Sequence, residues 1–324
     1  MQKKRIKNEK EKNSKLTIIV TGNGFDLECG LGSTYNNFFK WRIENDANCK
    51  CVFDRKDQLE NEPSKIFTYL GENPDINVWE LILIMAIDYA DNSQWYNIEQ
   101  TMSYTINNYT EKKTFWDIVI DRCNKRLVNF YLEDDIMSAI GIIMYKRYYE
   151  SLKSYISEIS SESFYISLLK ELNAYEAKFS EFLKEKLEST ENYFEKQKNL
   201  IEKIFKMTVN DGSYKIVSFN YTPYLFTEEY LNIHGNLEKP IFGINSVVID
   251  HKYAPIFTKP FRRIIDDLDR IKSFIGDDYE NVIFYGSSFS DLDLDHFTLI
   301  LKNKSIKKIF FCYTEYDGVD RRVS

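Results

Sequence analysis

The sequence predicts an α/β protein with a mostly parallel sheet and a large helical insertion. Short apolar runs rich in β-branched and aromatic residues lie near both ends of the chain, as expected for strands buried on both faces. Between them, a long middle region carries apolar residues at three- and four-residue spacing, which is typical of amphipathic helices. If strands from both ends share one sheet, the intervening helices form an insertion in it.

The first predicted strand covers residues 16–21 (LTIIVT) and ends at a Gly-x-Gly turn. Four more strands are predicted at residues 214–220, 241–249, 281–287 and 306–314. Residues 75–207 are predicted to be almost wholly helical. We therefore expect residues 16–45 and 208–324 to form an α/β core, and residues 46–207 to form a mainly helical insertion.

Charge is distributed unevenly along the chain. The 324 residues have a net charge of −7, but residues 1–15 carry seven basic and two acidic side chains. This basic segment is expected to be a disordered tail, because it holds few apolar side chains. The acidic remainder argues against broad binding of nucleic acid, whose phosphates attract basic surfaces.

Composition also indicates the compartment and excludes several classes of protein. No apolar window is long enough to cross a bilayer, so no membrane association is expected. The five cysteines are scattered without a CxxC pair, as in reduced cytoplasmic proteins. No metal site is predicted, because the chain has three histidines and the acidic run Asp291, Asp293 and Asp295 lacks the glycine and glutamate of an EF-hand. The P-loop, HExxH and GxSxG motifs are absent from the sequence.

The turn after the first strand, Gly22–Asp26, is the strongest local sign of a ligand site. Glycines at 22 and 24 allow a sharp turn, and a phosphate can lie against the N–H groups that begin the following helix. Asp26 offers an acceptor for a ribose hydroxyl or for capping the loop. A Rossmann-like sheet is therefore predicted, although Leu27 replaces the third glycine of the dinucleotide fingerprint and disfavours hydride transfer. A tight turn that binds no ligand remains the structural alternative.

Three further segments combine polar residues with strand ends or glycines: Phe219–Thr222 (FNYT), Ile233–Gly235 (IHG) and Tyr285–Asp291 (YGSSFSD). In open α/β sheets, ligands bind where the carboxyl ends of the strands converge. Asn220 can hydrogen-bond a ribose or a water, and His234 is suited to act as a general base near neutral pH. The structural alternatives are a capped turn for Asn220, a satisfied buried histidine for His234, and a helix N-cap for the serines.

Taken in order, five segments resemble the AbiH family of bacterial phage abortive-infection proteins. They are residues 19–39 (IVTGNGFDLECGLGSTYNNFF), 94–100 (QWYNIEQ), 218–222 (SFNYT), 233–245 (IHGNLEKPIFGIN) and 285–297 (YGSSFSDLDLDHF). Members of that family look like distant relatives of the Sir2-like NAD-cleaving effectors. The resemblance therefore implies a Rossmann-like (Sir2-like) fold that acts on NAD or a related nucleotide and requires no cofactor.

The resemblance also implies roles for individual residues. Asn220 matches the asparagine that handles the ribose and the attacking water, and His234 matches the catalytic histidine. Glu99 is predicted to be a second carboxylate that stabilises the cationic sugar. The nucleotide-binding residues are expected to be Gly22, Asn23, Gly24, Phe25, Asp26, Thr222, Gly235, Gly286, Ser287, Ser288 and Asp291.

These inferences together predict a cytoplasmic anti-phage effector that hydrolyses the N-glycosidic bond of NAD or a related nucleotide. Its expected partners are the nucleotide, a phage-derived trigger or a protein of the same defence system, and a second copy of the chain. The spacing of 14 residues between Asn220 and His234 is shorter than expected for Sir2-like effectors, which favours the alternative of a nucleotide-sensing or protein-binding module without turnover. A nuclease is a third alternative, disfavoured by the acidic charge, and the lack of CxxC zinc pairs disfavours deacetylation.

Overall fold

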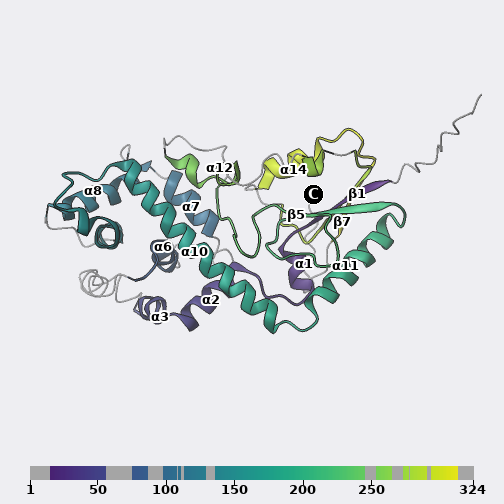
Figure 1. Ribbon diagram of the computed structural model, residues 1–324, viewed down its shortest axis with the longest axis horizontal. Helices are drawn as coiled ribbons and strands as arrows, with labels where there is room; N and C mark the ends of the chain where they lie inside the picture. The colour runs from purple at the N-terminus through teal and green to yellow at the C-terminus, as the bar shows by residue number, and fades with distance from the viewer. Residues whose placement is uncertain are drawn as a thin grey trace, which may run out of the picture. The chain divides into compact units, whose positions relative to one another are not determined.

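The computed structural model describes residues 15–55, 75–86, 98–107, 109–110, 113–128, 136–244, 253–264, 273–276, 278–289 and 293–312. Its contacts divide the chain into two compact units, both visible in Figure 1. The sheet unit comprises Met1–Leu31, Glu191–Ile233 and Asp269–Ser324, and the helical unit comprises Gly32–Thr190 and His234–Leu268. Each unit is therefore assembled from separate stretches of chain.

The sheet unit is built on five parallel strands. They are β1 (Leu16–Thr21), β4 (Ser213–Ser218), β5 (Tyr230–Asn232), β6 (Asn281–Tyr285) and β7 (Lys308–Cys312). Their order across the sheet is β5-β4-β1-β6-β7, and Ile19 of the central strand lies opposite Ile216 and Ile283. The chain places β4 and β5 on one side of β1 and then β6 and β7 on the other, so the direction of strand addition reverses between β1 and β6.

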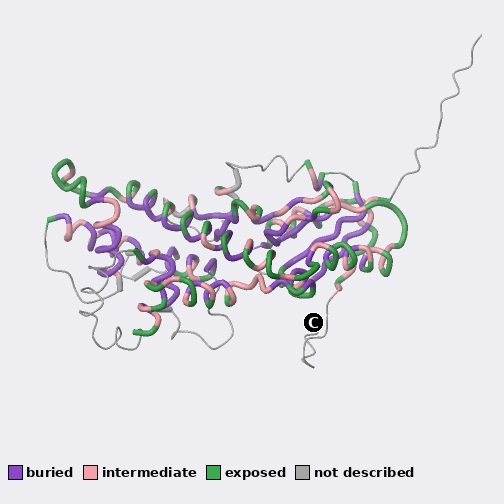
Figure 2. Tube along the Cα trace, turned by 60° about the horizontal axis from the view of Figure 1, so that its bottom comes forward, coloured by how far each residue is buried: buried purple, intermediate pink, exposed green. Residues whose placement is uncertain are grey.

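Helices cover both faces of this sheet. They are α1 (Asn23–Glu28), α11 (Tyr193–Thr208) and α14 (Leu294–Leu301). In Figure 1, α14 lies over one face, and α1 and α11 lie over the other. Phe297 of α14 belongs to the same buried cluster as Ile18 and Val20, whereas Phe25 of α1 packs edge-on against Tyr285 with ring centroids 5.8 Å apart. Cover on both faces explains why β1 and β6 are buried, and buried segments run through the sheet unit in Figure 2. The edge strand β7 is exposed or half-buried along its length.

The helical unit contains mainly helices and one small hairpin. Its elements are α2 (Tyr35–Asn45), α3 (Ala47–Asp54), α6 (Val78–Ala86), α7 (Ile98–Asn107), β2 (Tyr109–Thr110), β3 (Lys113–Thr114), α8 (Phe115–Leu127), α9 (Ile136–Met144), the π-helical η1 (Tyr145–Tyr149), the 3-10 turns η2 (Glu150–Leu152) and η4 (Ala254–Phe257), α10 (Ser161–Ser189) and α12 (Lys259–Ile264). Side chains cap several of these helices: Thr34 accepts from the N–H of Asn37 at the start of α2, and Thr114 forms a capping box with Asp117 at α8.

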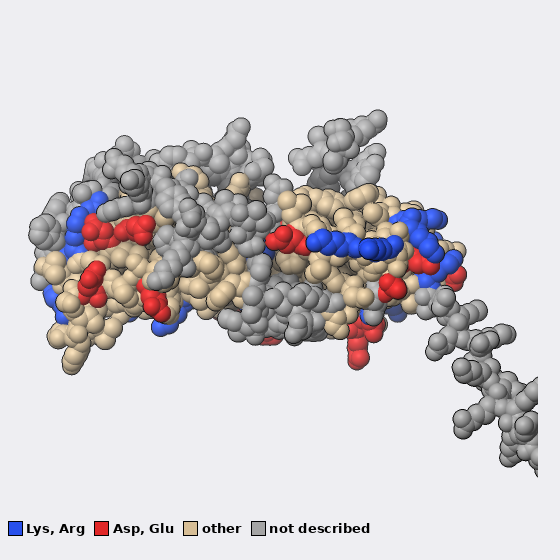
Figure 3. Space-filling view, turned by 90° about the horizontal axis from the view of Figure 1, so that it is seen from above, with Lys and Arg blue, Asp and Glu red and all other residues tan. Residues whose placement is uncertain are grey.

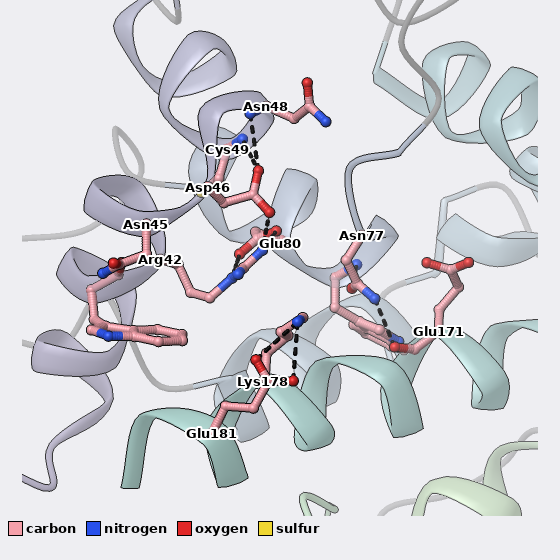
Figure 4. A network of polar contacts seen from close by, with 12 residues as sticks. Arg42, Asn45, Asp46, Asn48, Cys49, Asn77, Glu80, Glu171, Lys178 and Glu181 are labelled. Carbon is pink, nitrogen blue, oxygen red and sulfur yellow. Dashed lines mark hydrogen bonds and ion pairs between the residues drawn. The ribbon is translucent and has the colours of Figure 1, made fainter. Parts of the chain in front are cut away.

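Aromatic rings and buried ion pairs hold the helical unit together. The ring centroid of Phe179 in α10 lies 5.0 Å from that of Phe38 in α2 and 5.1 Å from that of Phe242. Close by in the same unit, Arg42 of α2 forms a buried ion pair with Glu80 of α6, as Figure 4 shows. Such a pair is stable in the interior only while both partners are present.

The structure confirms most of the predicted strands with small changes at their ends. The strand at residues 16–21 has the predicted bounds, and the strands predicted at 214–220, 281–287 and 306–314 correspond to β4, β6 and β7 with ends that differ by at most two residues. Residues 313–314 lie outside the described part of the chain. The prediction of a strand at 241–249 is wrong for residues 241–244, which form only an isolated bridge between Ile244 and Thr258, and residues 245–249 lie outside the described part. The sheet instead takes β5, which the sequence analysis did not identify.

Side chains of the helical unit explain why residues 241–244 do not join the sheet. The N–H of Phe242 donates to Glu176 at 2.6 Å, and the N–H of Gly243 donates to Glu99 at 3.2 Å. These carboxylates occupy donors that a sheet ladder would need. The apolar side chains of this segment are buried within the helical unit.

The two units also differ from the predicted division of the chain. Helix α11 packs in the sheet unit, although residues 46–207 were expected to form the insertion. Conversely, residues 32–45 and His234–Leu268 belong to the helical unit. Of the predicted tail, residues 1–14 lie outside the described part of the chain.

Both acidic and basic side chains lie on the described surface. On the face shown in Figure 3, acidic and basic side chains lie close to one another. Exposed pairs include Lys178 with Glu181 and Lys307 with Glu280. No described helix has the length and hydropathy needed to span a membrane.

Candidate functional site

Three predicted segments converge at the carboxyl ends of adjacent strands in the sheet unit. The GNGFD segment follows β1, the FNYT segment follows β4, and the YGSS segment overlaps the end of β6. Because β1 is paired with β4 on one side and with β6 on the other, these segments come from three neighbouring strands. Both neighbours run parallel to β1, so all three segments lie at the same edge of the sheet.

The glycines of two of these segments are packed against each other. The N–H of Gly22 donates to the carbonyl of Tyr285 at 3.0 Å, and that of Gly24 donates to Gly286 at 2.9 Å. A Cβ atom on Gly22 would lie 2.6 Å from the Gly286 oxygen. Gly286 itself has φ +63°, and a Cβ there would lie 2.4 Å from the nitrogen of Phe25. Close backbone approach therefore requires these glycines.

This packing changes the predicted role of the backbone N–H groups. Those of Gly22 and Gly24 donate across to the β6 turn, and that of Phe25 donates to Gly22 at 2.9 Å. Binding a phosphate through the N–H groups of Gly22 and Gly24 would require the two turns to separate. The side chains of Asn23 and Ser288 are exposed at the same strand ends, Ser287 is half-buried, and Phe25 is a core residue.

Asn220 connects the FNYT segment to the GNGFD segment. Its side chain is 3% exposed, and its Nδ2 donates to the carbonyl of Gly22 at 3.0 Å. Its backbone N–H donates to Oγ of Ser218 at 3.1 Å. The side chain therefore fixes the relative positions of two strand ends that are 198 residues apart in the sequence.

Asp26 lies at the centre of a buried hydrogen-bond cluster in the sheet unit. Tyr193 Oη donates to Asp26 Oδ1 at 2.7 Å, and Thr222 Oγ1 lies 3.2 Å from Asp26 Oδ2. Gln197 in turn donates to Tyr193 Oη at 3.3 Å. Burial raises the pKa of Asp26 to about 7, against the opposing effect of hydrogen bonds from Tyr193, Thr222 and Asn220. A carboxyl group of this kind can gain or lose a proton near neutral pH.

The cluster around Asp26 makes the stability of the sheet unit depend on pH. With a pKa raised from 3.8 to about 7, Asp26 favours folding most below pH 4, and this contribution is lost as the pH rises through 7. We expect Asp26→Asn to remove this dependence. Urea unfolding followed by circular dichroism at pH 5 and pH 8 should show a larger loss of stability for the wild type than for Asp26→Asn. Equal losses in the two proteins would contradict the raised pKa.

Tyr193 and Gln197 are not among the site residues predicted from the sequence. They lie four residues apart on one face of α11, and both side chains are buried. On an ordinary surface helix, the polar atoms of such side chains would be exposed to water. The sequence does not indicate that this face of α11 contacts Asp26. The prediction therefore placed α11 in the helical insertion. The contact spans 167 residues of sequence.

A second cluster, in the helical unit, contains the predicted catalytic residues His234 and Glu99. Both are buried, at 7% and 5% exposure, together with Lys259 at 1%. Lys259 Nζ lies 3.0 Å from Glu99 Oε2 and 3.2 Å from His234 Nε2. Lys259 is the first residue of α12, and the sequence analysis did not include it, because a lone lysine at the start of a short helix carries no signal.

Local backbone geometry holds His234 in place. The next residue, Gly235, has φ +89°, and a Cβ there would lie 2.2 Å from the Lys239 oxygen. The N–H of Ile241 donates to the carbonyl of His234 at 2.8 Å, which closes the turn. Gly235 therefore meets a backbone requirement of this turn.

The predicted site residues thus fall into two groups. One group is in the sheet unit and includes Asn220 and the GNGFD and YGSS residues. The other is in the helical unit and comprises Glu99, His234 and Gly235. The division between the units falls between Ile233 and His234. Asp291 lies outside the described residues.

Comparison with known proteins identifies the family of the chain. No curated protein and no solved structure matches it. The family described as bacteriophage abortive infection AbiH matches residues 18–314. Because this match covers most of the sequence, the chain belongs to the AbiH family, and its role is in abortive infection, a defence against bacteriophages.

Proposed function

We propose that this protein contributes to abortive infection by hydrolysing the N-glycosidic bond of NAD or a related nucleotide. The observation that carries the proposal is the convergence of the GNGFD, FNYT and YGSS segments at the ends of three adjacent parallel strands. The direction of strand addition reverses between β1 and β6, and nucleotides bind at such points in Rossmann-like sheets. We therefore assign nucleotide binding to this edge of the sheet unit.

In the proposed reaction, water replaces nicotinamide at the anomeric carbon of the ribose. The products are nicotinamide, ADP-ribose and a proton. Asn220 orients the ribose or the water, and His234 acts at the bond that breaks, as the family resemblance implies. Glu99 is the second carboxylate, which stabilises the cationic sugar. Asp26, whose carboxyl titrates near pH 7 and hydrogen-bonds Asn220, is a further group able to exchange a proton with the reactants.

The proposal is tested by incubating the purified protein with NAD and measuring free nicotinamide by chromatography. We expect wild-type protein to release nicotinamide, and Asn220→Ala and His234→Ala to reduce the rate at least a hundredfold, about 2.7 kcal/mol. Asn232→Ala is the matched control, because Asn232 Nδ2 donates to the carbonyl of Thr222 at 3.1 Å and anchors the same segment. Activity that survives in both Asn220→Ala and His234→Ala would overturn the site assignment.

One observation favours the second candidate, a nucleotide-sensing module without turnover. The N–H groups of Gly22 and Gly24 already have partners, and Asp26 is 1% exposed, so a ligand would have to rearrange this edge of the sheet to reach them. A change of structure on binding is the property of a sensor. Under this candidate, a nucleotide would copurify with the protein and be released chemically unchanged on denaturation.

A further inference from the structure

A buried lysine separates the two predicted catalytic residues of the helical unit. Lys259 begins α12, Glu99 belongs to the first turn of α7, and His234 precedes the Gly235 turn. Lys259 Nζ is within hydrogen-bonding distance of both Glu99 Oε2 and His234 Nε2. The position of Lys259 is fixed by its backbone N–H, which donates to the carbonyl of Ile244 at 3.0 Å.

Lys259 and Glu99 form a buried ion pair. Glu99 Oε1 accepts the N–H of Gly243 at 3.2 Å, and Glu99 Oε2 faces the ammonium group at 3.0 Å. A buried carboxylate needs such partners, and a buried ammonium needs a counter-ion, so the two groups stabilise each other's charge. The neighbouring charges Glu176 and Arg262 form their own ion pair, with Glu176 Oε2 2.8 Å from Arg262 Nη2.

A charged lysine determines which nitrogen of His234 carries the proton. An ammonium group has three donors and no acceptor, so His234 Nε2 must accept from it and the ring proton must lie on Nδ1. A proton on Nε2 would instead point a second donor at Lys259 Nζ, 3.2 Å away. We propose that Lys259 is a positioning residue that holds His234 as the neutral Nδ1–H tautomer.

This tautomer reverses the role predicted for His234. With Nε2 occupied by Lys259 and Nδ1 already protonated, the imidazole can donate a hydrogen bond but cannot accept a proton without losing its contact to Lys259. In the proposed hydrolysis, the proton of the attacking water therefore goes to another group. This role rests on the proposed hydrolase function, whereas the tautomer itself does not.

Nitrogen-15 NMR of the full chain, labelled at histidine and measured without nucleotide at pH 7.5, tests the assignment. The chain has three histidines, so the His234 signals are identified by their absence from His234→Gln. We expect a protonated Nδ1 and an unprotonated Nε2. A protonated Nε2, alone or together with a protonated Nδ1, would overturn the proposal whether or not the protein hydrolyses NAD.

Two substitutions test whether Lys259 is the cause. Lys259→Met should release Nε2 and shift His234 toward the Nε2–H tautomer that histidine prefers in water. Lys239→Met removes an exposed charge near the same turn and should leave the His234 signals unchanged. An unchanged tautomer in Lys259→Met, or an equal shift in both variants, would overturn the role of Lys259. If Lys259→Met does not fold, the wild-type spectrum still decides which nitrogen is protonated.

Discussion

Replacing Gly286 by alanine is expected to weaken nucleotide binding by the sheet unit at least tenfold and to lower its stability by about 2–4 kcal/mol. The new Cβ would lie 2.4 Å from the nitrogen of Phe25 and 2.8 Å from Cα of Gly24, and both are backbone atoms that cannot rotate away. The φ angle of +63° adds strain, because alanine rarely adopts it. The β6 turn must therefore move away from the GNGFD segment and break the hydrogen bond between Gly24 and Gly286.

Calorimetric titration with ADP-ribose, a reaction product that retains the diphosphate, measures the effect on binding. We expect Gly286→Ala to weaken the affinity at least tenfold relative to wild type, about 1.4 kcal/mol. Gly212→Ala is the matched control, since Gly212 has φ +106° and its Cβ would lie 2.1 Å from the Lys15 oxygen. That contact joins the residues before β4 and β1, at the opposite end of the strands, so Gly212→Ala should lose stability and keep its affinity. Equal affinity in Gly286→Ala and wild type would contradict a binding role for this edge.

The second large effect is expected in the helical unit, where Glu80→Ala should lower the free energy of unfolding by about 3 kcal/mol or more. Arg42 Nε lies 2.6 Å from Glu80 Oε1, and Arg42 Nη2 lies 3.2 Å from Glu80 Oε2, so the pair is bidentate. Glu80 is 1% exposed and Arg42 is 6% exposed. Removing the carboxylate leaves a guanidinium buried with one remaining carboxylate partner, Asp46 at 2.7 Å.

Tryptophan fluorescence isolates this effect, because the sequence ranges of the sheet unit contain no tryptophan, whereas the helical unit contains Trp41, Trp79 and Trp116. Denaturant unfolding followed by this signal should show the large loss for Glu80→Ala. The control is Glu181→Ala, which breaks an exposed pair with Lys178 that appears in the same view (Figure 4). Exposed pairs contribute about 0–1 kcal/mol, so the control should unfold close to wild type. Similar losses in both variants would show that burial does not make the ion pair of Arg42 and Glu80 contribute more to the free energy of unfolding than an exposed pair does.

The central strands β1 and β6 were predictable because burial on both faces produces a distinct sequence pattern. Ile18, Ile19 and Val20 are consecutive and fully buried, and a run of this kind next to Gly22 indicates a central strand followed by a tight turn. The convergence of the GNGFD and YGSS segments followed from the geometry of parallel strands. Their hydrogen bonds to each other were not predictable, because both segments also match the pattern of a ligand-binding loop.

The remainder of the candidate site depends on contacts that leave no local pattern. Tyr193 reaches Asp26 across 167 residues, from a helix whose apolar periodicity is the same in either unit. Residues 241–244 are apolar enough for a strand, yet Glu176 and Glu99 bind their N–H groups. A carboxylate that competes with a sheet ladder cannot be identified without knowing which helix lies beside the segment. Tertiary contacts therefore override strand propensity here.

The most direct test of nucleotide hydrolysis measures the nucleotide pool of phage-infected bacteria by mass spectrometry. Cells expressing the wild-type protein should lose NAD while nicotinamide and ADP-ribose accumulate, and cells expressing Asn220→Ala should keep their NAD and lose protection against the phage. An unchanged nucleotide pool in cells that the wild-type protein still protects would contradict nucleotide hydrolysis as the basis of its function.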